Sequence, residues 1–246
     1  MLKLIGDLHT HTLASTHAYS TILENANAAR EEGLAYLAWT DHAPGMEDSP
    51  HPWHFHFTNF PERIGGVRIL RGVEADIVDH AGGLDMDGEA LAELDWVVAS
   101  IHGCMYPAAS PEENTAAYLG AAKNPIVDMI GHSGLERYPY DYDAAVKRIA
   151  ELGKLVEINE ATFSVRENSI ENCKKIARAC RRFECRVAVN SDAHFCRNIG
   201  HMERALKLLR EVNFPERLIV NASRESMEEY LAERGRRVAA ATAPRH

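Results

Sequence analysis

The chain has 246 residues, of which 46% are hydrophobic, and a formal net charge of −9. One α/β barrel commonly occupies about 200–250 residues, and no Pro/Gly/Ser-rich linker divides the sequence, so we expect a single domain over residues 1–246. The acidity argues against sequence-independent binding to nucleic acid, and no apolar run approaches the ~20 residues of a membrane span.

Short apolar runs recur along the chain, and each ends at a polar residue that precedes a stretch of helical periodicity. The runs are Leu2–Gly6, Leu34–Thr40, Arg68–Glu74, Asp95–Ile101, Val127–His132, Leu155–Asn159 and Arg186–Ser191, with a weaker eighth at Arg217–Val220. Between them, segments such as Thr21–Glu32 and Asn168–Arg181 carry apolar residues near a 3.6-residue period. A last helix is expected from a cap at Ser223 to about Arg234, with Gly235 as its C-cap glycine. Strands that alternate with helices predict right-handed crossovers and a parallel sheet.

Histidines and acidic residues collect at or just past the C-terminal ends of these strands. They are Asp7, His9, His11, His17, His42, Glu74, His102, His132, Asp192 and His194. Because side chains alternate across a strand, His9 and His11 point to one side, and Asp192-x-His194 repeats the arrangement. A closed barrel gathers all its C-terminal loops around one mouth, whereas a doubly wound sheet has one switch point. We therefore predict an α/β barrel of seven or eight units, with the site at the C-terminal mouth.

Imidazole and carboxylate groups are the ligands of catalytic zinc, iron and manganese. The candidates are too many for one ion and suit two or three, provided that a carboxylate such as Glu74 bridges them. Two ions roughly 3.5–4 Å apart stabilise both oxygens of a displacement at phosphorus and activate water near pH 7. The predicted reaction is hydrolysis of a phosphate ester, and we assign Glu74, Asp192 and His194 to the catalytic centre.

Each motif by itself has a simpler explanation. Two strand histidines are often ordinary polar residues, and Thr40-Asp41-His42 can end a strand in an Asx-turn. His102 and His132 each fit a hydrogen-bonded position in a βα turn. Their joint occurrence at successive strand ends favours metal binding, because unpaired buried polar groups at one mouth are costly.

Residues outside the strand ends are harder to interpret. His17 lies in a loop, and its position alone leaves a ligand role open. The His51–His56 segment is either a lid or substrate contact, or the surface packing of a long loop. Arg71 is expected in a surface ion pair rather than as a phosphate clamp. The five cysteines are odd in number and lack a C-x-x-C pair, and the N-terminus does not resemble a signal peptide, so we predict a cytoplasmic protein.

At these residues the chain resembles the PHP (polymerase and histidinol phosphatase) family of metal-dependent phosphoesterases over most of its length. The motifs are His9-Thr-His11, Thr40-Asp41-His42, the Glu74 and His102 pair, Gly131-His132 and Asn190-Ser-Asp192-Ala-His194. The loop segments Ala14–Ser20, Thr40–Asp48 and Pro52–Phe55 are similar to the stand-alone YcdX-like phosphatase branch.

The resemblance implies a distorted (β/α)7 barrel with a trinuclear centre of about three Zn²⁺ per chain, for which Mn²⁺ or Fe are alternatives. The first metal would take His9, His11, Glu74 and Asp192, the second would share Glu74 and add His102 and His132, and the third would take His17, His42 and His194. Asp7 is expected behind these ligands, orienting a histidine. Phosphatase activity and a homotrimer are also implied.

We therefore expect a hydrolase of phosphate monoesters with a small phosphorylated substrate. One alternative is a phosphodiesterase or exonuclease acting on nucleotides, which the acidity and the lack of a basic aromatic groove disfavour. A second alternative is a non-catalytic metal-binding protein. The ligands are too widely distributed and too rich in carboxylates for a closed structural zinc site.

Overall fold

The computed structural model describes residues 2–47, 49–107 and 109–243. The described residues exclude Asp48, which is the last residue of the Thr40–Asp48 segment. They also exclude both ends of the expected 1–246 domain. Within them, seven parallel strands follow the order β1-β2-β4-β5-β6-β7-β8, and β3 pairs antiparallel with β4. The strands are β1 Gly6–Thr10, β2 Tyr36–Trp39, β3 Arg63–Ile64, β4 Val67–Asp76, β5 Trp96–Ser100, β6 Met129–Ile130, β7 Leu155–Asn159 and β8 Val187–Asn190.

The sheet curls until its first and last strands meet. Thr10 and Ala193 form a parallel bridge, and the amide of His11 donates to the carbonyl of Ala193 at 2.9 Å. The amide of Asp192 donates to the carbonyl of His9 at 3.0 Å. The prediction of a distorted seven-unit barrel is confirmed, and this closure brings the first and last motifs of the sequence together.

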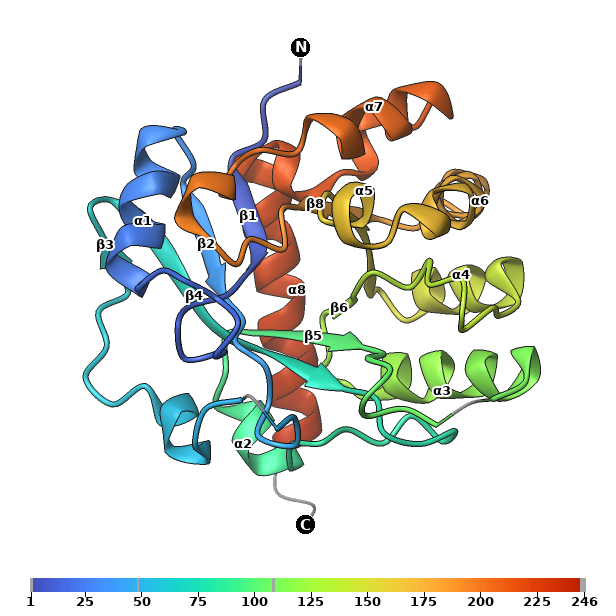
Figure 1. Ribbon diagram of the computed structural model, residues 1–246, viewed down its shortest axis with the longest axis horizontal. Helices are drawn as coiled ribbons and strands as arrows, with labels where there is room; N and C mark the ends of the chain where they lie inside the picture. Colours follow the sequence, from blue (N-terminus) through green and yellow to red (C-terminus); the bar gives the residue numbers. More distant parts are fainter. Residues whose placement is uncertain (1, 48, 108, 244–246) are drawn as a thin grey trace.

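Helices cover the outer face of the strands. The α-helices are α1 Ile22–Glu31, α2 Gly88–Ala92, α3 Pro111–Lys123, α4 Tyr142–Glu151, α5 Thr162–Val165, α6 Ile170–Arg182, α7 Glu203–Glu211 and α8 Arg224–Thr242; the 3-10 helices are η1 Pro52–His56, η2 Glu167–Ser169, η3 Cys196–Asn198, η4 Glu216–Leu218 and η5 Val220–Ala222. Figure 1 shows α3, α4 and α6 stacked in succession along one side of the strands. None of the helices in the described residues is long and apolar enough to cross a bilayer.

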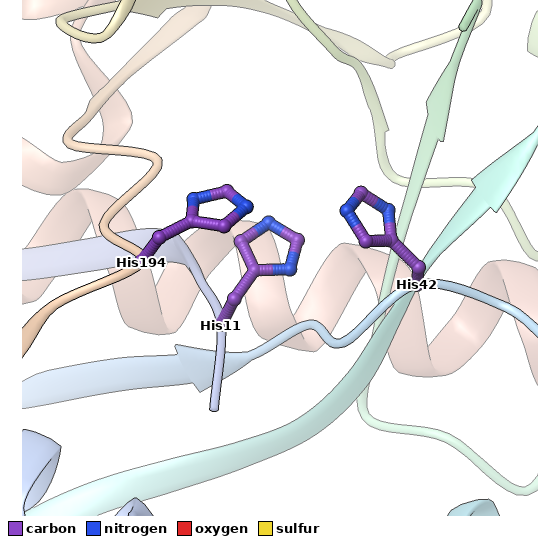
Figure 2. A group of neighbouring side chains, drawn as sticks. All are labelled: His11, His42 and His194. Carbon is purple, nitrogen blue, oxygen red and sulfur yellow. The ribbon is translucent and has the colours of Figure 1, made fainter. Parts of the chain in front are cut away.

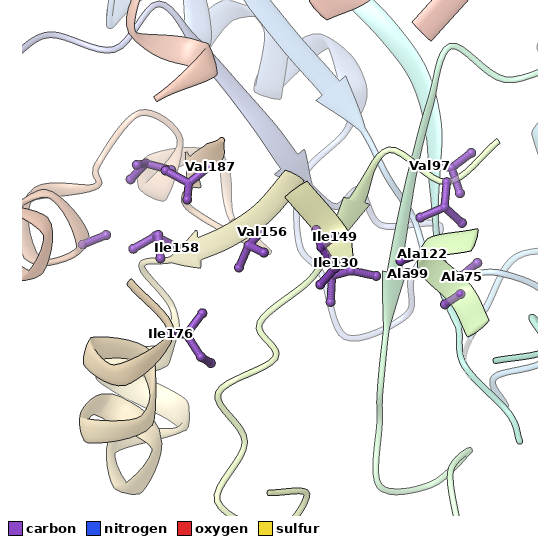
Figure 3. Packing of buried hydrophobic residues seen from close by; sticks show 14 of the residues in the cluster. Ala75, Val97, Ala99, Ala122, Ile130, Ile149, Val156, Ile158, Ile176 and Val187 are labelled. Carbon is purple, nitrogen blue, oxygen red and sulfur yellow. The ribbon is translucent and has the colours of Figure 1, made fainter. Parts of the chain in front are cut away.

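Alternation along the strands divides the core into two parts. Inward residues such as Tyr36, Leu70 and Trp96 fill the barrel and are at most 1% exposed. Outward residues such as Val97 and Val156 pack under the helices, as Figure 3 shows. The strands are apolar on both faces because the helices cover one face and the filled interior of the barrel covers the other.

Helix α8 closes the end of the barrel opposite to the mouth. Its Met227 and Tyr230 are fully buried against Trp96 and Tyr36, which are the first residues of β5 and β2. Because parallel strands begin at the same end, this contact lies at the N-terminal end of the barrel. The C-terminal mouth is thereby left open for the site.

Two expectations about the ends of the chain differ from the structure. The first strand starts at Gly6 instead of ending there. Its residues Asp7, His9 and Thr10 are polar, and so the apolar pattern ended before them, but all three are buried in the barrel. The weak eighth run, Arg217–Val220, forms 3-10 turns and joins the sheet only by a bridge from Ile219 to Val187 among the described pairs.

The last helix continues through Gly235, where a C-cap was expected. It extends to Thr242, although glycine costs about 1 kcal/mol within a helix. Arg234 and Arg237, on either side of Gly235, donate to the two carboxylate oxygens of Asp128 at 2.8 and 2.7 Å. These tertiary ion pairs hold the helix together beyond the residue that would have ended it.

Candidate metal centre

All the predicted metal ligands lie around the C-terminal mouth of the barrel. His9 and Glu74 belong to β1 and β4, and the others follow the strand ends: His11, His17, His42, His102, His132, Asp192 and His194. Figure 2 shows the rings of His11, His42 and His194 approaching one another. The ring centroids of His11 and His194 lie 4.2 Å apart, and those of His17 and His194 lie 4.5 Å apart. The loop residue His17 therefore joins the cluster.

Glu74 lies at the centre of the cluster. Its Oε2 faces His9 Nε2 at 3.2 Å, His11 Nε2 at 3.5 Å and His42 Nδ1 at 3.1 Å, and its Oε1 faces His132 Nε2 at 2.9 Å and His102 Nε2 at 3.7 Å. Neighbouring ligands of a tetrahedral zinc with bonds of about 2.0–2.1 Å lie about 3.3–3.4 Å apart. These separations match a metal coordination shell, and the two oxygens of Glu74 face different imidazoles, as a bridging carboxylate does.

Several of these buried atoms have no hydrogen-bond partner among the described residues. They are His9 Nε2, both ring nitrogens of His11, His42 Nδ1, Glu74 Oε2, His132 Nδ1 and His194 Nε2. Leaving one buried polar atom unpaired costs about 1–3 kcal/mol, so this concentration of them calls for a ligand. The atoms are the nitrogen and oxygen donors that divalent transition metals bind. The residues present therefore fit a metal centre.

The outer nitrogens of three rings are held by hydrogen bonds. His9 Nδ1 lies 2.8 Å from Glu157 Oε1, His102 Nδ1 lies 2.7 Å from Asp76 Oδ1, and His194 Nδ1 lies 3.0 Å from the carbonyl of Asp192. A ring that donates through Nδ1 presents the lone pair of Nε2 to the cluster. Each of these contacts fixes the tautomer that a metal ligand needs.

Glu157 and Asp76 are absent from the residues predicted by sequence. Asp76 follows Glu74 by two positions on β4, and Glu157 precedes Asn159 by two on β7. The same alternation that paired His9 with His11 could have placed both carboxylates on the inner face.

Asp7, which was expected to orient a histidine, instead holds a loop. Its Oδ1 accepts the amide of Ser191 at 3.0 Å and its Oδ2 accepts the amide of Gly200 at 3.2 Å. Burial raises the pKa of Asp7 to about 6, although the hydrogen bonds from Ser191 and Gly200 oppose this shift. Asp7 thus anchors the segment that carries Asp192 and His194 against β1.

The pKa values of Glu74 and His11 in the cluster favour an ionised carboxylate and a neutral imidazole. Burial would raise the pKa of Glu74, but the charges of His9 and His102 and hydrogen bonds from His132 hold that pKa well below its ordinary value. Burial and the neighbouring rings of His194 and His42 lower the pKa of His11 to about 3. An ionised Glu74 beside a neutral His11 is the protonation pattern of metal ligands.

Asp192 is held in an uncommon backbone conformation. Its φ of 57° lies in the left-handed region, which non-glycine residues seldom adopt. Its Oδ2 accepts hydrogen bonds from Asn159 Nδ2 at 3.1 Å and Arg166 Nη1 at 3.2 Å. A strained backbone of this kind persists where neighbouring groups hold the residue in place, as Asn159 and Arg166 hold Asp192.

A cavity of about 760 Å³ opens above the cluster, within the range of about 300–1,000 Å³ of small-molecule sites. Its lining includes Glu74, Asp192 and His194 from the cluster, together with Arg166 and Arg204. Arg166 follows the short helix α5 rather than a strand end, and so sequence reasoning missed it. Arg71, in contrast, pairs with Asp95 at 2.7 Å, which confirms the predicted ion pair.

A seven-stranded parallel barrel whose mouth gathers histidines and carboxylates defines a class of α/β barrels with a candidate metal centre at the C-terminal mouth. The PHP domain profile matches residues 7–233, and the chain therefore belongs to the PHP family, as its motifs predicted. It is 42% identical over 238 residues to a probable phosphatase of Acetivibrio thermocellus, covering 96% of this chain and 99% of the relative. It is 43% identical over 240 residues to a probable phosphatase of Caldanaerobacter subterraneus, covering 96% and 94%.

The fold is also similar to that of a solved histidinol phosphate phosphatase from Lactococcus lactis. That structure was determined in complex with zinc, L-histidinol and phosphate. The two chains superpose with a TM-score of 0.58 at 17% identity, over 87% of this chain and 95% of the other. At 17% identity this similarity supports a common fold.

Proposed function

We propose that this protein hydrolyses phosphate monoesters of small molecules with metal-activated water. The observation that carries the proposal is the position of Glu74 among five imidazole nitrogens, at 2.9–3.7 Å, in the lining of the large cavity. The names of the relatives, probable phosphatases, support the reaction class.

Three zinc ions are the proposed metal content, and manganese or iron are alternatives because they share these ligands. The first ion would be held by His9, His11, Glu74 and Asp192, the second by Glu74, His102 and His132, and the third by His17, His42 and His194. Bound cations would lower the pKa of water towards neutrality and offset the charge of a phosphate group.

Arg166 is the proposed anchor for the phosphate. Within the described residues, the only hydrogen bond of its side chain goes from Nη1 to Asp192, and the side chain is 19% exposed. The other guanidinium donors remain for a ligand, and their planar arrangement matches the oxygens of a phosphate.

Glu74, Asp192 and His194 are the proposed catalytic residues. Glu74 and Asp192 would help to hold the cations, and the hydrogen bond from Arg166 would keep the Asp192 carboxylate in place. Burial lowers the pKa of His194 against the opposing charge of Asp192. Its ring is therefore neutral near pH 7 and serves as a ligand rather than as a proton donor.

Residues 1–246 would form one domain that works in the cytoplasm on a small phosphorylated substrate, without a membrane or nucleic-acid partner. A homotrimer would follow from the family resemblance.

Elemental analysis of the purified protein, followed by assays of p-nitrophenyl phosphate and its bis-ester, tests the proposal. We expect about three zinc ions per chain and dominant hydrolysis of the monoester. Replacing His9 and His11 by Ala should remove the first ion and abolish turnover. His56→Ala, at a half-exposed histidine of η1, is the matched control. Dominant diester turnover would favour the nuclease-type alternative, and a fully loaded protein without hydrolysis would favour a non-catalytic role.

A further inference from the structure

Asp41 is a fully buried carboxylate next to the metal ligand His42. It accepts hydrogen bonds from Thr12 N at 2.8 Å, Ser15 Oγ at 2.7 Å, Thr12 Oγ1 at 2.6 Å, Trp39 Nε1 at 2.5 Å and His54 Nε2 at 3.1 Å. Two of these donors reach Oδ1 and three reach Oδ2, so each oxygen has at least as many donors as its two lone pairs need. Asp41 is therefore a rigid junction.

The donors to Asp41 come from three separate segments. Thr12 and Ser15 belong to the loop after β1 that carries His17, Trp39 ends β2, and His54 lies on η1. Ser15 Oγ also accepts the amide of His42 at 3.1 Å. The junction thus connects His17 and His42, two of the three ligands proposed for the third metal.

His17 depends on this junction more than the strand residues His9 and Glu74 do. His9 and Glu74 stand on strands, whose positions the sheet determines. The loop of His17 is shaped by turn hydrogen bonds, from Ser15 N to the carbonyl of Thr12 at 2.9 Å and from Ala18 N to the carbonyl of Ser15 at 2.8 Å. The contacts of Thr12 and Ser15 with Asp41 fix this loop against β2.

His54 gives the His51–His56 segment a role that the sequence did not reveal. Its ring packs edge-on against Trp39, with centroids 5.0 Å apart, and its neighbour Phe55 is buried. Because an ionised carboxylate only accepts, His54 Nε2 is the donor to Asp41. The described lining of the 760 Å³ cavity includes no residue of His51–His56, which argues against a lid.

We propose that Asp41 and His54 form a positioning pair that sets the ligand geometry of the third metal. The inference rests on the three-metal centre proposed above. Removing the His54 donor takes away one of the three hydrogen bonds that hold Asp41 Oδ2. The carboxylate can then shift toward its remaining donors, and His17 and His42 lose the support that Asp41 gives them in common. The third metal should then be lost selectively.

Two substitutions separate the hydrogen bond from the packing of the ring. His54→Phe keeps an aromatic ring against Trp39 and removes the donor, whereas His54→Gln replaces the donor with an amide N–H. Zinc stoichiometry and stepwise affinities are measured by chelator competition and elemental analysis, with cobalt absorption as a second readout. Loss of a residue behind metal ligands typically weakens binding about 10–100-fold. We expect this loss for one of three ions in His54→Phe, and its recovery to within a few-fold in His54→Gln.

His56→Phe is the matched control. His56 lies on the same 3-10 helix, its side chain is 57% exposed, and its Nδ1 is 3.6 Å from Glu93. All three affinities should stay unchanged in this variant, and the thermal midpoint of each variant reports whether it is folded. Should His54→Phe fail to fold, Ser15→Ala removes the hydroxyl between Asp41 and the His42 amide and should weaken the same ion.

Three zinc ions bound with parental affinity by folded His54→Phe or Ser15→Ala would overturn the inference, as would equal losses in His54→Phe and His54→Gln. Metal counting does not depend on turnover. A parent protein that binds three ions without hydrolysing esters would refute the proposed function and leave the pair testable. A parent that binds only two would refute the pair itself.

Discussion

Glu157 Oε1 lies 2.8 Å from His9 Nδ1 in the interior of the barrel mouth. The same carboxylate accepts the amide of His132 at 2.8 Å, Asn190 Nδ2 at 2.9 Å and Asn159 Nδ2 at 3.1 Å. One side chain of β7 therefore holds groups from β1, β8 and the end of β6. Glu157 determines how the ligands are arranged around the barrel axis without belonging to the proposed ligand sets.

Glu157→Gln should weaken metal binding about 10–100-fold, because an amide nitrogen would face groups that are themselves donors. Competition with a chromogenic chelator measures the affinity. Glu151→Gln on α4, whose partner is the exposed Arg148, should bind metal normally. Parental affinity in Glu157→Gln would show that the contact with His9 is dispensable.

Arg166→Met should raise the KM for a phosphate monoester about 10–100-fold, because a hydrogen bond to a charged group contributes about 1.5–3 kcal/mol. Inorganic phosphate should inhibit the variant correspondingly less. Both assays use saturating zinc, because Arg166 also holds the proposed ligand Asp192. Initial rates and inhibition constants check both expectations. Arg178→Met, at an exposed position of α6, serves as the control. An unchanged KM in Arg166→Met would assign the phosphate to other groups.

Asp85→Asn should change how stability depends on pH. Burial and the charge of Asp76 raise the pKa of Asp85 to about 6, against about 3.9 in an unfolded chain. Between these values the unfolded state binds fewer protons than the folded state, so this group makes the parent less stable as pH rises. The Asp85→Asn variant has no titrating group at this position and therefore lacks this contribution to the pH dependence of stability.

The free energy of unfolding of Asp85→Asn, relative to the parent, should therefore increase from about pH 4 to pH 6 and stay level above. The substitution also removes an acceptor of the Gly45 amide, which lies 3.2 Å from Asp85 Oδ2. This loss lowers the free energy of unfolding by the same amount at each pH, so the trend with pH remains. Urea unfolding at several pH values measures it. A difference that is constant over this range would mean that Asp85 titrates normally.

Met227→Ala should lower the free energy of unfolding by about 2–5 kcal/mol, the usual cost of a large-to-small change in a core. Met227 is fully buried where α8 closes the N-terminal end of the barrel. Because the mouth lies at the opposite end, kcat of the folded variant should be unchanged. Glu229→Ala, exposed on the same helix, should leave stability within about 0.5 kcal/mol of the parent. A large change in kcat would show that the two ends are coupled.

Most of the candidate ligands could be placed at one mouth from the sequence because they lie on parallel strands or follow their C-terminal ends. The period of two is less reliable beyond a strand: Asp192 and His194 follow the end of β8, and Asp192 has a left-handed backbone instead of the extended one that the Asp192-x-His194 spacing predicted. The extent of the elements was less predictable. Gly235 suggested a helix end until Asp128, more than a hundred positions earlier in the chain, paired with Arg234.

By itself, the sequence determined that side chains of the metal-ligand type collect at the C-terminal ends of parallel strands, because residue type and the alternation of strands with helices can both be recognised locally. Only the tertiary structure decided which carboxylate holds which imidazole and that Arg166 reaches the mouth. His9 and Glu157 are 148 positions apart, and their contact depends on how the barrel closes. That closure is a collective result of packing, which no local pattern encodes.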